Sequence, residues 1–442
     1  MQIQLSDHFD YKRLLKFTAP SIAMMVFTSI YGVIDGFFVS NFTSKTAFAA
    51  VNLIFPYIMI LGAFGFMLGT GGTALVAKIL GEGDKRRANG IFSMIVFVSV
   101  FLGILISALG IIFIRPIAVL LGAEGELLDS AVKYGRIILV ALPAFMLQQE
   151  FQSFFIVAEK PKLGFISTVI AGVTNIILDA LLVMVLELGI VGAAVATALS
   201  QLIGGLIPLI YFLCERSGII RLTRPEFDIP ALVKASLNGS SEFMTNISMS
   251  VVCMLYNFRL MQHLGENGIA AYGVMMYVGF VFVAVFIGFT IGASPVISFN
   301  YGAENKRELK SLSRKCISVI AVFSVLMLIM SVCLTKPFSH IFVGYDKELL
   351  EITETGFFIY SFSFLFTGIA IYSSGFFTAL NNGVISALLS TLRILVFQVA
   401  AILVLPIFFG TMGIWYSLVV SEIFAAITSI LFIASFRKNY GY

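Results

Sequence analysis

Two aspartates stand deep inside long apolar stretches of the sequence. Asp35 follows an uncharged stretch that begins near residue 17, and Asp179 lies in one that begins near residue 163. A charged side chain at the middle of a bilayer costs ~2.5–3.5 kcal/mol on insertion scales, so such a residue must face a partner or a polar cavity. At a rise of about 1.5 Å per helical residue, both carboxyls lie at a similar depth, roughly 24–27 Å from the start of their stretches.

An amide accompanies the second aspartate. Asn175 and Asp179 are four residues apart, so a helix presents both on one face. Desolvation and a second carboxyl nearby both disfavour the charged form of a carboxyl group. Asp35, Asn175 and Asp179 therefore predict a shielded polar pocket that exchanges a proton near neutral pH. The alternative is that Asp179 only completes a hydrogen-bond network with Asn175, and that Asp35 is wetted near the outer mouth.

The second half of the chain carries its own charges in apolar stretches. Arg393 and Glu422 fall near mid-depth in neighbouring stretches, which predicts a structural ion pair or, alternatively, a place on the substrate path. Glu242 either binds a cationic substrate or pairs with Arg393. It heads a stripe of polar residues at helical spacing: Asn246, Ser250, Cys253 and Asn257. Glu150 lies near the end of its stretch and is expected to extend to the surface.

Several other chemistries lack the residues they need. The three histidines lie at a terminus or at the ends of apolar stretches, which leaves no buried imidazole base for an intramembrane enzyme. No G-x-x-x-x-G-K-[ST] phosphate loop occurs, and the four cysteines show no metal-ligand or disulfide spacing. We therefore predict no enzyme, no catalytic residue and no cofactor. The energy for any transport must come from an ion gradient.

The composition requires a membrane for these residues. Of 442 residues 59 % are hydrophobic and only 12 % are charged, and the mean hydropathy is +1.01. Continuously apolar stretches favour helices over barrel strands. We predict an all-α polytopic protein with twelve spans near residues 17–42, 46–80, 90–114, 131–158, 163–186, 190–213, 231–263, 268–299, 316–335, 352–378, 383–409 and 411–436.

Basic residues indicate the orientation. Most of the 28 Lys and Arg residues fall in connectors on the side of the N-terminus, whereas Glu124, Asp129 and Asp346 mark the opposite side. The positive-inside rule then predicts a multi-pass protein of the cytoplasmic membrane with both termini in the cytoplasm. The net charge of +4 is spread over these connectors and does not indicate nucleic-acid binding.

The two halves of the chain repeat one another. At an offset of half the chain length, Gly71 matches Gly292, Gly81 matches Gly302, and Lys85-Arg86 matches Lys306-Arg307. Six spans per half give a parallel repeat about a pseudo-two-fold axis along the membrane normal, with a cleft between the bundles. The predicted domains are a bundle at residues 1–214, a cytoplasmic linker at 215–234 and a second bundle at 235–442.

The sequence resembles the multidrug and toxic compound extrusion (MATE) family, in its bacterial MepA-like branch, over nearly the whole chain. The matching features include the Gly81–Lys85 loop, the Gly189–Thr197 stretch GIVGAAVAT and the Gly292–Ala303 stretch GASPVISFNYGA. They also include Pro20, Asp35, Asn52, Pro56, Asn175, Asp179, Arg393 and Gly413-Ile414-Trp415. One departure is that Ser361–Phe377 lacks the acidic residue that a branch of the family has there.

The resemblance implies a V-shaped antiporter that expels organic cations in exchange for protons or sodium, with Asp35, Asn175 and Asp179 binding the coupling ion. The implied partners are small cationic drugs and membrane lipids, and we expect a monomer. Alternatives are a flippase for lipid-linked oligosaccharides, which requires several deep cations where only Arg393 is present, and a lipid-modifying intramembrane enzyme, which lacks a buried base.

Overall fold

The computed structural model describes residues 3–442, and every regular element in that range is a helix. In chain order these are α1 (Tyr11–Phe42), α2 (Lys45–Gly81), α3 (Lys85–Leu120), α4 (Gly125–Val140), α5 (Leu142–Val157), α6 (Pro161–Asp179), the π-helical η1 (Ala180–Val185), α7 (Gly189–Cys214), α8 (Ile229–Gly302), α9 (Lys306–Val343), α10 (Lys347–Ser361), α11 (Phe364–Ala379), α12 (Gly383–Thr391), the π-helical η2 (Leu392–Gln398), α13 (Val399–Phe409) and α14 (Thr411–Tyr440).

The predicted twelve crossings are confirmed, although several are bent. Within residues 3–442, nine helices are long and apolar enough to cross a membrane, and two bent pairs add two crossings. The twelfth comes from α8, which folds back at Gly265 (φ 62°, ψ −150°). Its two arms both pack on the C-terminal half of α2, since Gly239 contacts Met67 and Gly302 contacts Lys78. Large apolar side chains such as Phe101 and Ile407 are exposed around the helices, as contact with lipid requires.

Two predicted spans are broken rather than straight. Span 131–158 consists of α4 and α5, which meet at 54°, and span 352–378 consists of α10 and α11, which meet at 52°. Pro143 lies in the first turn of α5, directly after the first break, where a residue without a backbone N–H is tolerated. The breaks lie half a chain length apart, and so do Gly189 (φ 57°) and Gly410 (φ 55°). The internal duplication inferred from the sequence therefore extends to the backbone.

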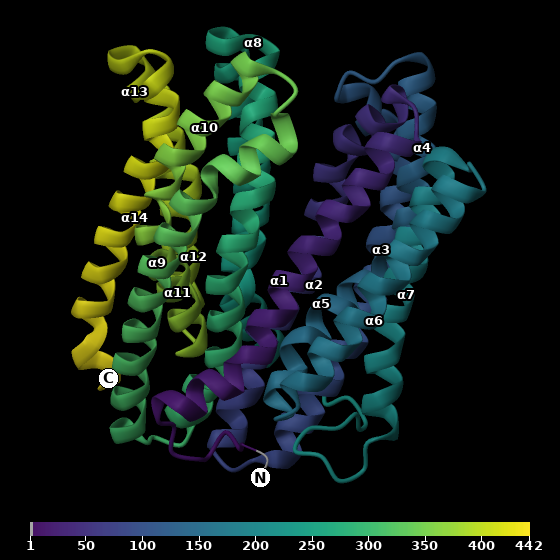
Figure 1. Ribbon diagram of the computed structural model, residues 1–442. Helices are drawn as coiled ribbons and strands as arrows, with labels where there is room; N and C mark the ends of the chain where they lie inside the picture. The colour runs from purple at the N-terminus through teal and green to yellow at the C-terminus, as the bar shows by residue number, and fades with distance from the viewer. Residues whose placement is uncertain (1–2) are drawn as a thin grey trace.

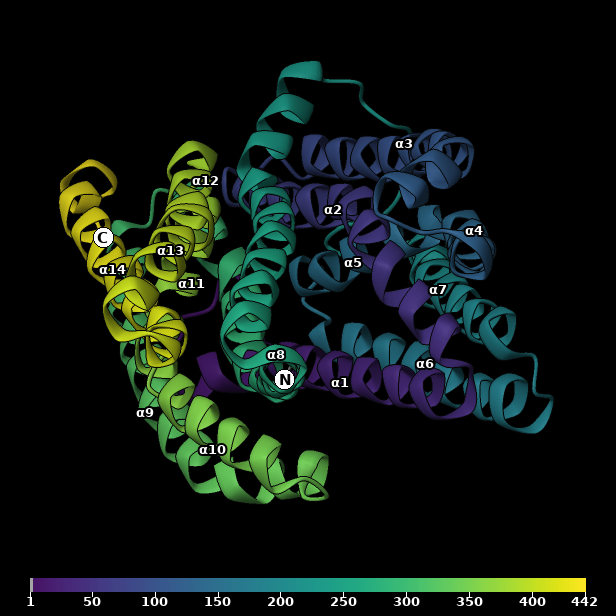
Figure 2. The same ribbon diagram turned by 90° about the horizontal axis from the view of Figure 1, so that it is seen from above.

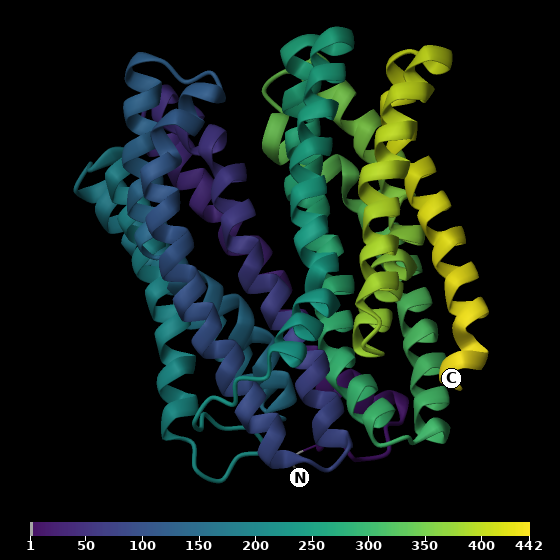
Figure 3. The same ribbon diagram turned by 180° about the vertical axis from the view of Figure 1, so that it is seen from behind.

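The two halves form bundles that converge on the side of the chain termini, here called the terminal side (Figures 1 and 3). They lean apart toward the opposite side, here called the distal side. A Cβ added at Gly71 on α2 would lie 2.0 Å from the carbonyl oxygen of Ala235 on α8. The second arm of α8 comes equally close to α1, since a Cβ at Gly288 would lie 2.6 Å from Ile22 Cα. Seen from above, α1, α2 and α8 form the seam between the bundles (Figure 2).

Two segments cross from one bundle to the other on the terminal side. Residues 3–10, the N-terminal segment, precede α1 but bind α9, because Glu308 accepts hydrogen bonds from Phe9 N at 3.0 Å and pairs with His8 Nδ1 at 2.7 Å. Residues 215–228, the linker segment, precede α8 but bind α3. Arg87 pairs with Asp228 at 3.0 Å, and Asn89 Oδ1 accepts from Arg221 N at 2.9 Å.

The observed linker is shorter than the predicted one at 215–234. Helix α8 begins at Ile229 because Asp228 caps it, accepting a hydrogen bond from Ala231 N at 3.0 Å. At its other end the linker is held by Glu215, whose carboxylate lies 2.8 Å from Lys160 Nζ. That ammonium, with the Tyr211 hydroxyl, lowers the pKa of Glu215 to about 2.

Candidate functional site

Three helices of the N-terminal bundle bring the predicted ion-binding residues together. Asp35 of α1 lies beside Asn175 and Asp179 of α6, close enough for their side chains to interact as hydrogen-bond partners. Helix α7 adds Thr197, whose hydroxyl donates to Asp35 Oδ1 at 3.3 Å. These four residues are called the Asp35 cluster below.

The cluster is shielded and incompletely bonded. Asn175 is 1 % exposed, Asp179 is 0 % exposed, and Asp35 is half-buried. Within residues 3–442, neither carboxylate oxygen of Asp179 and neither amide atom of Asn175 completes a hydrogen bond of good geometry. A buried polar group without a partner costs about 1–3 kcal/mol, and native proteins rarely retain one without a reason. The cluster therefore has acceptor atoms oriented for a proton or a small cation.

Local packing explains how α6 reaches α1. A Cβ at Gly172, one turn before Asn175, would lie 2.6 Å from the Phe27 ring and 2.8 Å from the Tyr31 ring, so only glycine allows this approach. Directly after Asp179 the chain widens into the π-helical η1, and such turns are frequent at functional sites. A Cβ at Gly32, one turn before Asp35, would meet no atom within 4 Å. Helices α6 and α1 therefore pack closely at Gly172, whereas there is open space next to Gly32.

Tyrosines surround the cluster, and sequence spacing did not indicate them. Tyr134 of α4 interacts electrostatically with both Asp35 and Asp179, and Tyr277 of the second arm of α8 interacts with Asp35. The Tyr277 hydroxyl lies 3.9 Å from the position of a Cβ at Gly36. A residue of the C-terminal bundle thus stands next to the Asp35 cluster of the N-terminal bundle.

The donor set of the cluster consists of oxygen atoms and one amide nitrogen. Carboxylate, amide and hydroxyl oxygens suit a proton or a hard cation. No group of three or more His, Cys, Asp or Glu residues that could hold a metal ion occurs within residues 3–442. Any metal bound by Asp35, Asn175 and Asp179 would therefore need the amide and hydroxyl oxygens as ligands, as sodium allows.

The C-terminal bundle contains a separate ionic network. Arg393 Nε, in the π-helical η2, donates to both carboxylate oxygens of Glu422 at 3.0 and 3.1 Å. The pair is largely buried, with side chains 17 % and 5 % exposed. Glu242 lies near enough to Arg393 to interact with its charge. The structure thus brings Arg393, Glu422 and Glu242 together, and the Arg393 guanidinium is paired with the Glu422 carboxylate.

The rest of the polar stripe below Glu242 bonds along its own helix. Asn246 Nδ2 donates to Glu242 O at 2.8 Å, and Asn257 Nδ2 lies 3.9 Å from Cys253 Sγ. These side chains are partly exposed.

Glu150 corrects one expectation. It does not extend to the surface but is 0 % exposed on α5, where Ser99 of α3 is a polar neighbour. Gly69 of α2 packs against the backbone of Glu150, so α2 covers this part of α5. The bend between α4 and α5 turns this face of α5 into the bundle, which a straight span could not indicate.

Comparisons with known proteins find matches in both bundles. The family model MatE matches residues 20–181 and 242–404, one segment in each bundle. The multidrug export protein MepA of Staphylococcus saprophyticus is 26 % identical over 97 % of this chain and 94 % of its own length, and that of Staphylococcus aureus strain MRSA252 is 25 % identical over the same shares.

Solved structures share the fold. A multidrug resistance MATE family transporter of the MOP superfamily, described in an outward-facing conformation, has a TM-score of 0.92, 22 % identity and coverage of 98 % of this chain and 97 % of its own. A MOP superfamily transporter from Pyrococcus furiosus, described as having a binding pocket of reverse polarity, has a TM-score of 0.91, 22 % identity and 98 % coverage of both chains. Because the family model covers most of the chain, with one match in each bundle, this multi-pass membrane protein belongs to the MatE family of transporters.

Proposed function

We propose that the protein exports cationic and amphiphilic drugs in exchange for protons or sodium, by exposing its binding site alternately to the two sides of the membrane. Curated relatives that match nearly the whole chain are named multidrug export proteins, which supports this activity over an enzymatic one. The observation that carries the proposal is the Asp35 cluster. Two carboxyl groups lie side by side there in a shielded, incompletely bonded site.

The cluster couples ion to cargo through competition. Two neighbouring carboxylates cannot both hold their charge without a cation between them, because like charges at close range repel strongly in a poorly solvated site. An ion that enters from outside neutralises them, and its release frees the charge that attracts a cationic drug. Tyr277 of the C-terminal bundle stands beside Asp35, so a change in the charge of the cluster acts directly on a residue of the other bundle.

The proposed cargo chemistry follows from the acids and rings near the seam. Phe64 of α2 and Phe243 of α8 face each other across the bundles with ring centroids 4.9 Å apart, and Glu242 adjoins Phe243 in the chain. Aromatic faces and a carboxylate attract flat organic cations through apolar burial, cation–π contact and charge.

A vesicle experiment tests the proposal. Purified protein in proteoliposomes should expel ethidium when a pH or sodium gradient is imposed. Asp35→Asn should abolish gradient-driven efflux while the protein remains folded, because the amide mimics a permanently protonated acid. Asp129→Asn is the matched control, since Asp129 is exposed on the distal side and pairs only loosely with Arg115 at 3.7 Å. Gradient-dependent efflux by the Asp35 variant would refute the assignment.

Repeating the measurement at clamped pH with and without sodium distinguishes the two coupling ions. Sodium-dependent efflux under that condition assigns Asp35, Asn175 and Asp179 as metal ligands, whereas sodium-independent efflux assigns them to proton transfer. The oxygen donors of the cluster suit either ion.

A lipid-linked oligosaccharide flippase of the same superfamily remains the second candidate. A diphosphate cargo needs several unpaired cations at mid-depth in the membrane, and the one cation that the sequence places there, Arg393, is already bonded to Glu422. This pairing favours drug export.

We also infer that the terminal side faces the cytoplasm. The Gly81–Lys85 turn, the linker segment and the first ten residues of α9 lie on this side, and together they carry nine basic residues. Basic connectors are retained on the cytoplasmic side.

A further inference from the structure

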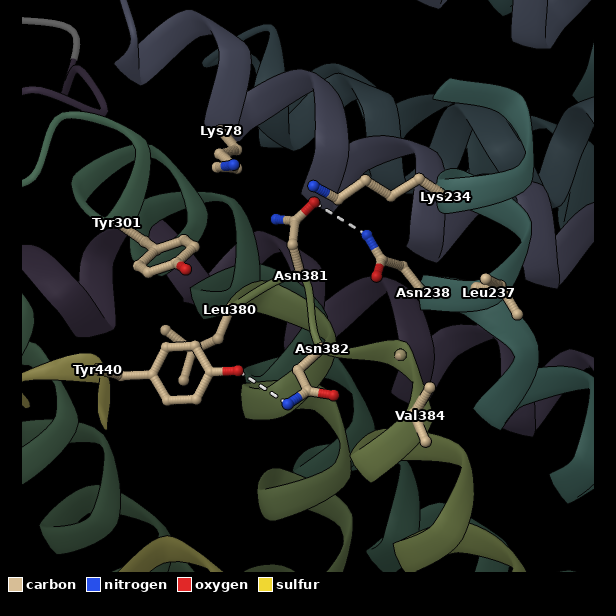
Figure 4. A pocket seen from close by; sticks show the side chains of 11 residues that line it. Lys78, Lys234, Leu237, Asn238, Tyr301, Leu380, Asn381, Asn382, Val384 and Tyr440 are labelled. Carbon is tan, nitrogen blue, oxygen red and sulfur yellow. Dashed lines mark hydrogen bonds between the residues drawn. The ribbon is translucent and has the colours of Figure 1, made fainter. Parts of the chain in front are cut away.

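A small polar cavity lies between the two bundles on the terminal side, far from the Asp35 cluster along α1 and α2. Figure 4 shows its lining, which comes from the end of α2, both arms of α8, the turn between α11 and α12, and the end of α14. The lining includes Lys78, Lys234, Asn238, Tyr301, Asn382 and Tyr440. Each bundle therefore contributes part of the wall.

The cavity is positively charged. Its lining residues include two lysines, one from each bundle, and no acidic residue. Lys78 Nζ is paired with Glu82 at 3.2 Å, outside the lining, and lies 5.7 Å from the centre of the Tyr301 ring. Lys234 makes no ion pair within residues 3–442, and its charged neighbours include Lys78 and Arg87 as well as Glu82. Two ammonium groups that face each other across the seam repel unless an anion lies between them.

Neutral donors are held in place around the lysines. Asn238 Nδ2 donates to Asn381 Oδ1 at 2.9 Å, and Asn381 Nδ2 donates across the seam to Ala74 O at 3.2 Å. Asn382 Nδ2 donates to the Tyr440 hydroxyl oxygen at 2.7 Å, which leaves the Tyr440 proton available for another acceptor. Figure 4 shows these groups converging from several directions. The two ammonium groups and the Tyr440 hydroxyl are thus the donors that this network leaves available to an anion.

The size of the cavity limits its occupant. Its volume is about 200 Å³. Pockets for drug-sized ligands run from about 300 to 1,000 Å³, and one water takes about 30 Å³ of liquid. The cavity is therefore too small for the exported cargo, but it has room for a tetrahedral anion with a few waters.

We propose that this cavity binds a phosphate group, supplied by an anionic phospholipid of the adjacent leaflet or by free phosphate, and that the bound group bridges Lys78 and Lys234. Basic pockets between transmembrane helices near the membrane surface are a recognised form of lipid headgroup site. The bridge replaces repulsion between the bundles with attraction to a shared anion. If the proposed alternating access holds, the anion stabilises the state closed on the terminal side, but binding itself does not depend on transport.

Thermal unfolding of the full chain measures the binding. The protein is reconstituted in nanodiscs of phosphatidylcholine alone or with phosphatidylglycerol, and separately titrated with inorganic phosphate in phosphatidylcholine at constant ionic strength set with sodium chloride. The variants are Lys234→Gln and, as a control, Lys310→Gln, which removes an equal charge from an exposed position on the same side. One lysine near a membrane surface contributes about 1 kcal/mol, so Lys234→Gln should weaken anion binding about five-fold.

We expect phosphatidylglycerol or phosphate to raise the midpoint temperature of thermal unfolding of the wild type and of Lys310→Gln. The rise should be smaller for Lys234→Gln. A rise with phosphatidylglycerol alone identifies a lipid headgroup, and a rise with inorganic phosphate identifies a free anion. The proposal is overturned if neither anion raises the midpoint of wild type, or if Lys234→Gln responds as Lys310→Gln does. A transport-inactive Asp35→Asn protein should still show the full shift, which separates this test from that of the export proposal.

Discussion

At the scale of single residues, the Asp35 cluster contains buried polar atoms whose hydrogen bonds are incomplete, namely those of Asn175 and Asp179. Within residues 3–442, the hydroxyl of Thr197 is the one hydrogen-bond donor of good geometry to the Asp35 carboxylate, at 3.3 Å. A neutral hydrogen bond contributes about 0.5–1.5 kcal/mol, so this contact tunes the site rather than holding the fold together. In the proposed cation-bound state, the hydroxyl would supply an additional oxygen ligand.

Replacing Thr197 by valine tests that role. Thr197→Val keeps the branched shape but removes the oxygen, so the affinity for the coupling ion should fall roughly two- to ten-fold with little loss of stability. The affinity is measured from the ion concentration that half-saturates drug efflux in proteoliposomes. Thr174→Val is the matched control, because the exposed Thr174 hydroxyl bonds only to Ile170 O on its own helix. Equal behaviour of the two variants would remove Thr197 from the site.

At the scale of elements, the two crossing segments show how the duplicated halves are fastened to each other. Each half is preceded by a segment that binds the third crossing of the other half. Glu308 of α9 holds the N-terminal segment, and Arg87 of α3 holds the linker segment. These two residues occupy equivalent positions of the repeat, with opposite charges.

Asp228 combines two functions that substitution can separate. It caps α8 and pairs with Arg87, at 3.0 Å in each case. Asp228→Ala removes both interactions and should lower the free energy of unfolding by about 0.5–2 kcal/mol, chiefly through the lost cap. Asp228→Asn keeps the cap and loses only a partly exposed ion pair, so it should cost less than about 1 kcal/mol. Chemical denaturation in detergent measures both, and an asparagine variant as weak as the alanine variant would contradict the division.

At the scale of the whole molecule, close backbone contact holds the bundles together on the terminal side. At Gly71, a Cβ would lie 2.0 Å from Ala235 O and 2.4 Å from Gly239 N. Both are backbone atoms that cannot rotate away, so any side chain there must separate α2 from α8.

Gly71→Ala should therefore destabilise the closed seam. Overpacking of this kind costs about 1–3 kcal/mol and should lower the midpoint of thermal unfolding. Gly273→Ala is the control, because a Cβ at Gly273 of α8 would meet no atom within 4 Å. That variant should be neutral or more stable, since alanine favours helix over glycine. A Gly71→Ala protein as stable as Gly273→Ala would show that the bundles do not need this approach.

Docking of the N-terminal segment should depend on pH. Glu159, in the turn after α5, accepts a hydrogen bond from Leu5 N at 2.6 Å, and burial raises its pKa from 4.5 to about 7. The folded state thus binds the proton more tightly than the unfolded state. Its contribution to stability is full below about pH 4.5, falls as the pH rises through about 7 and is constant above that.

The measurement is the unfolding midpoint from pH 4.5 to 8. The contribution of Glu159 is at most about 3 kcal/mol and is reduced by the partial access of water to the turn. Glu159→Gln should flatten the profile over this range. Glu304→Gln, at an exposed turn residue with a similar positive φ, should leave the profile as in wild type. An unchanged slope in the Glu159 variant would exclude this residue as the cause.

Much of the architecture could be predicted because it follows from local and periodic properties of the chain. Apolar length predicted the twelve crossings, and matching residues such as Gly81 and Gly302 revealed the repeat. The expectation of a transporter rather than an enzyme is confirmed by membership of the MatE family. The grouping of Asp35 with Asn175 and Asp179 could be predicted from the sequence because side chains can meet only if they lie at a similar depth along their helices.

The features that the sequence did not indicate depend on direction around and between helices. Hydropathy gives the length of a span but not its rotation or its bend, so Glu150 was expected at the surface although the break at Ala141 turns it inward. Thr197 and Tyr277 are ordinary residues of apolar helices until packing places them beside Asp35. The sequence by itself determined the number of crossings, the repeat and the charges that needed shelter. Only the tertiary structure decided which faces of the helices look at one another, because that choice depends on how whole helices pack and not on any one residue.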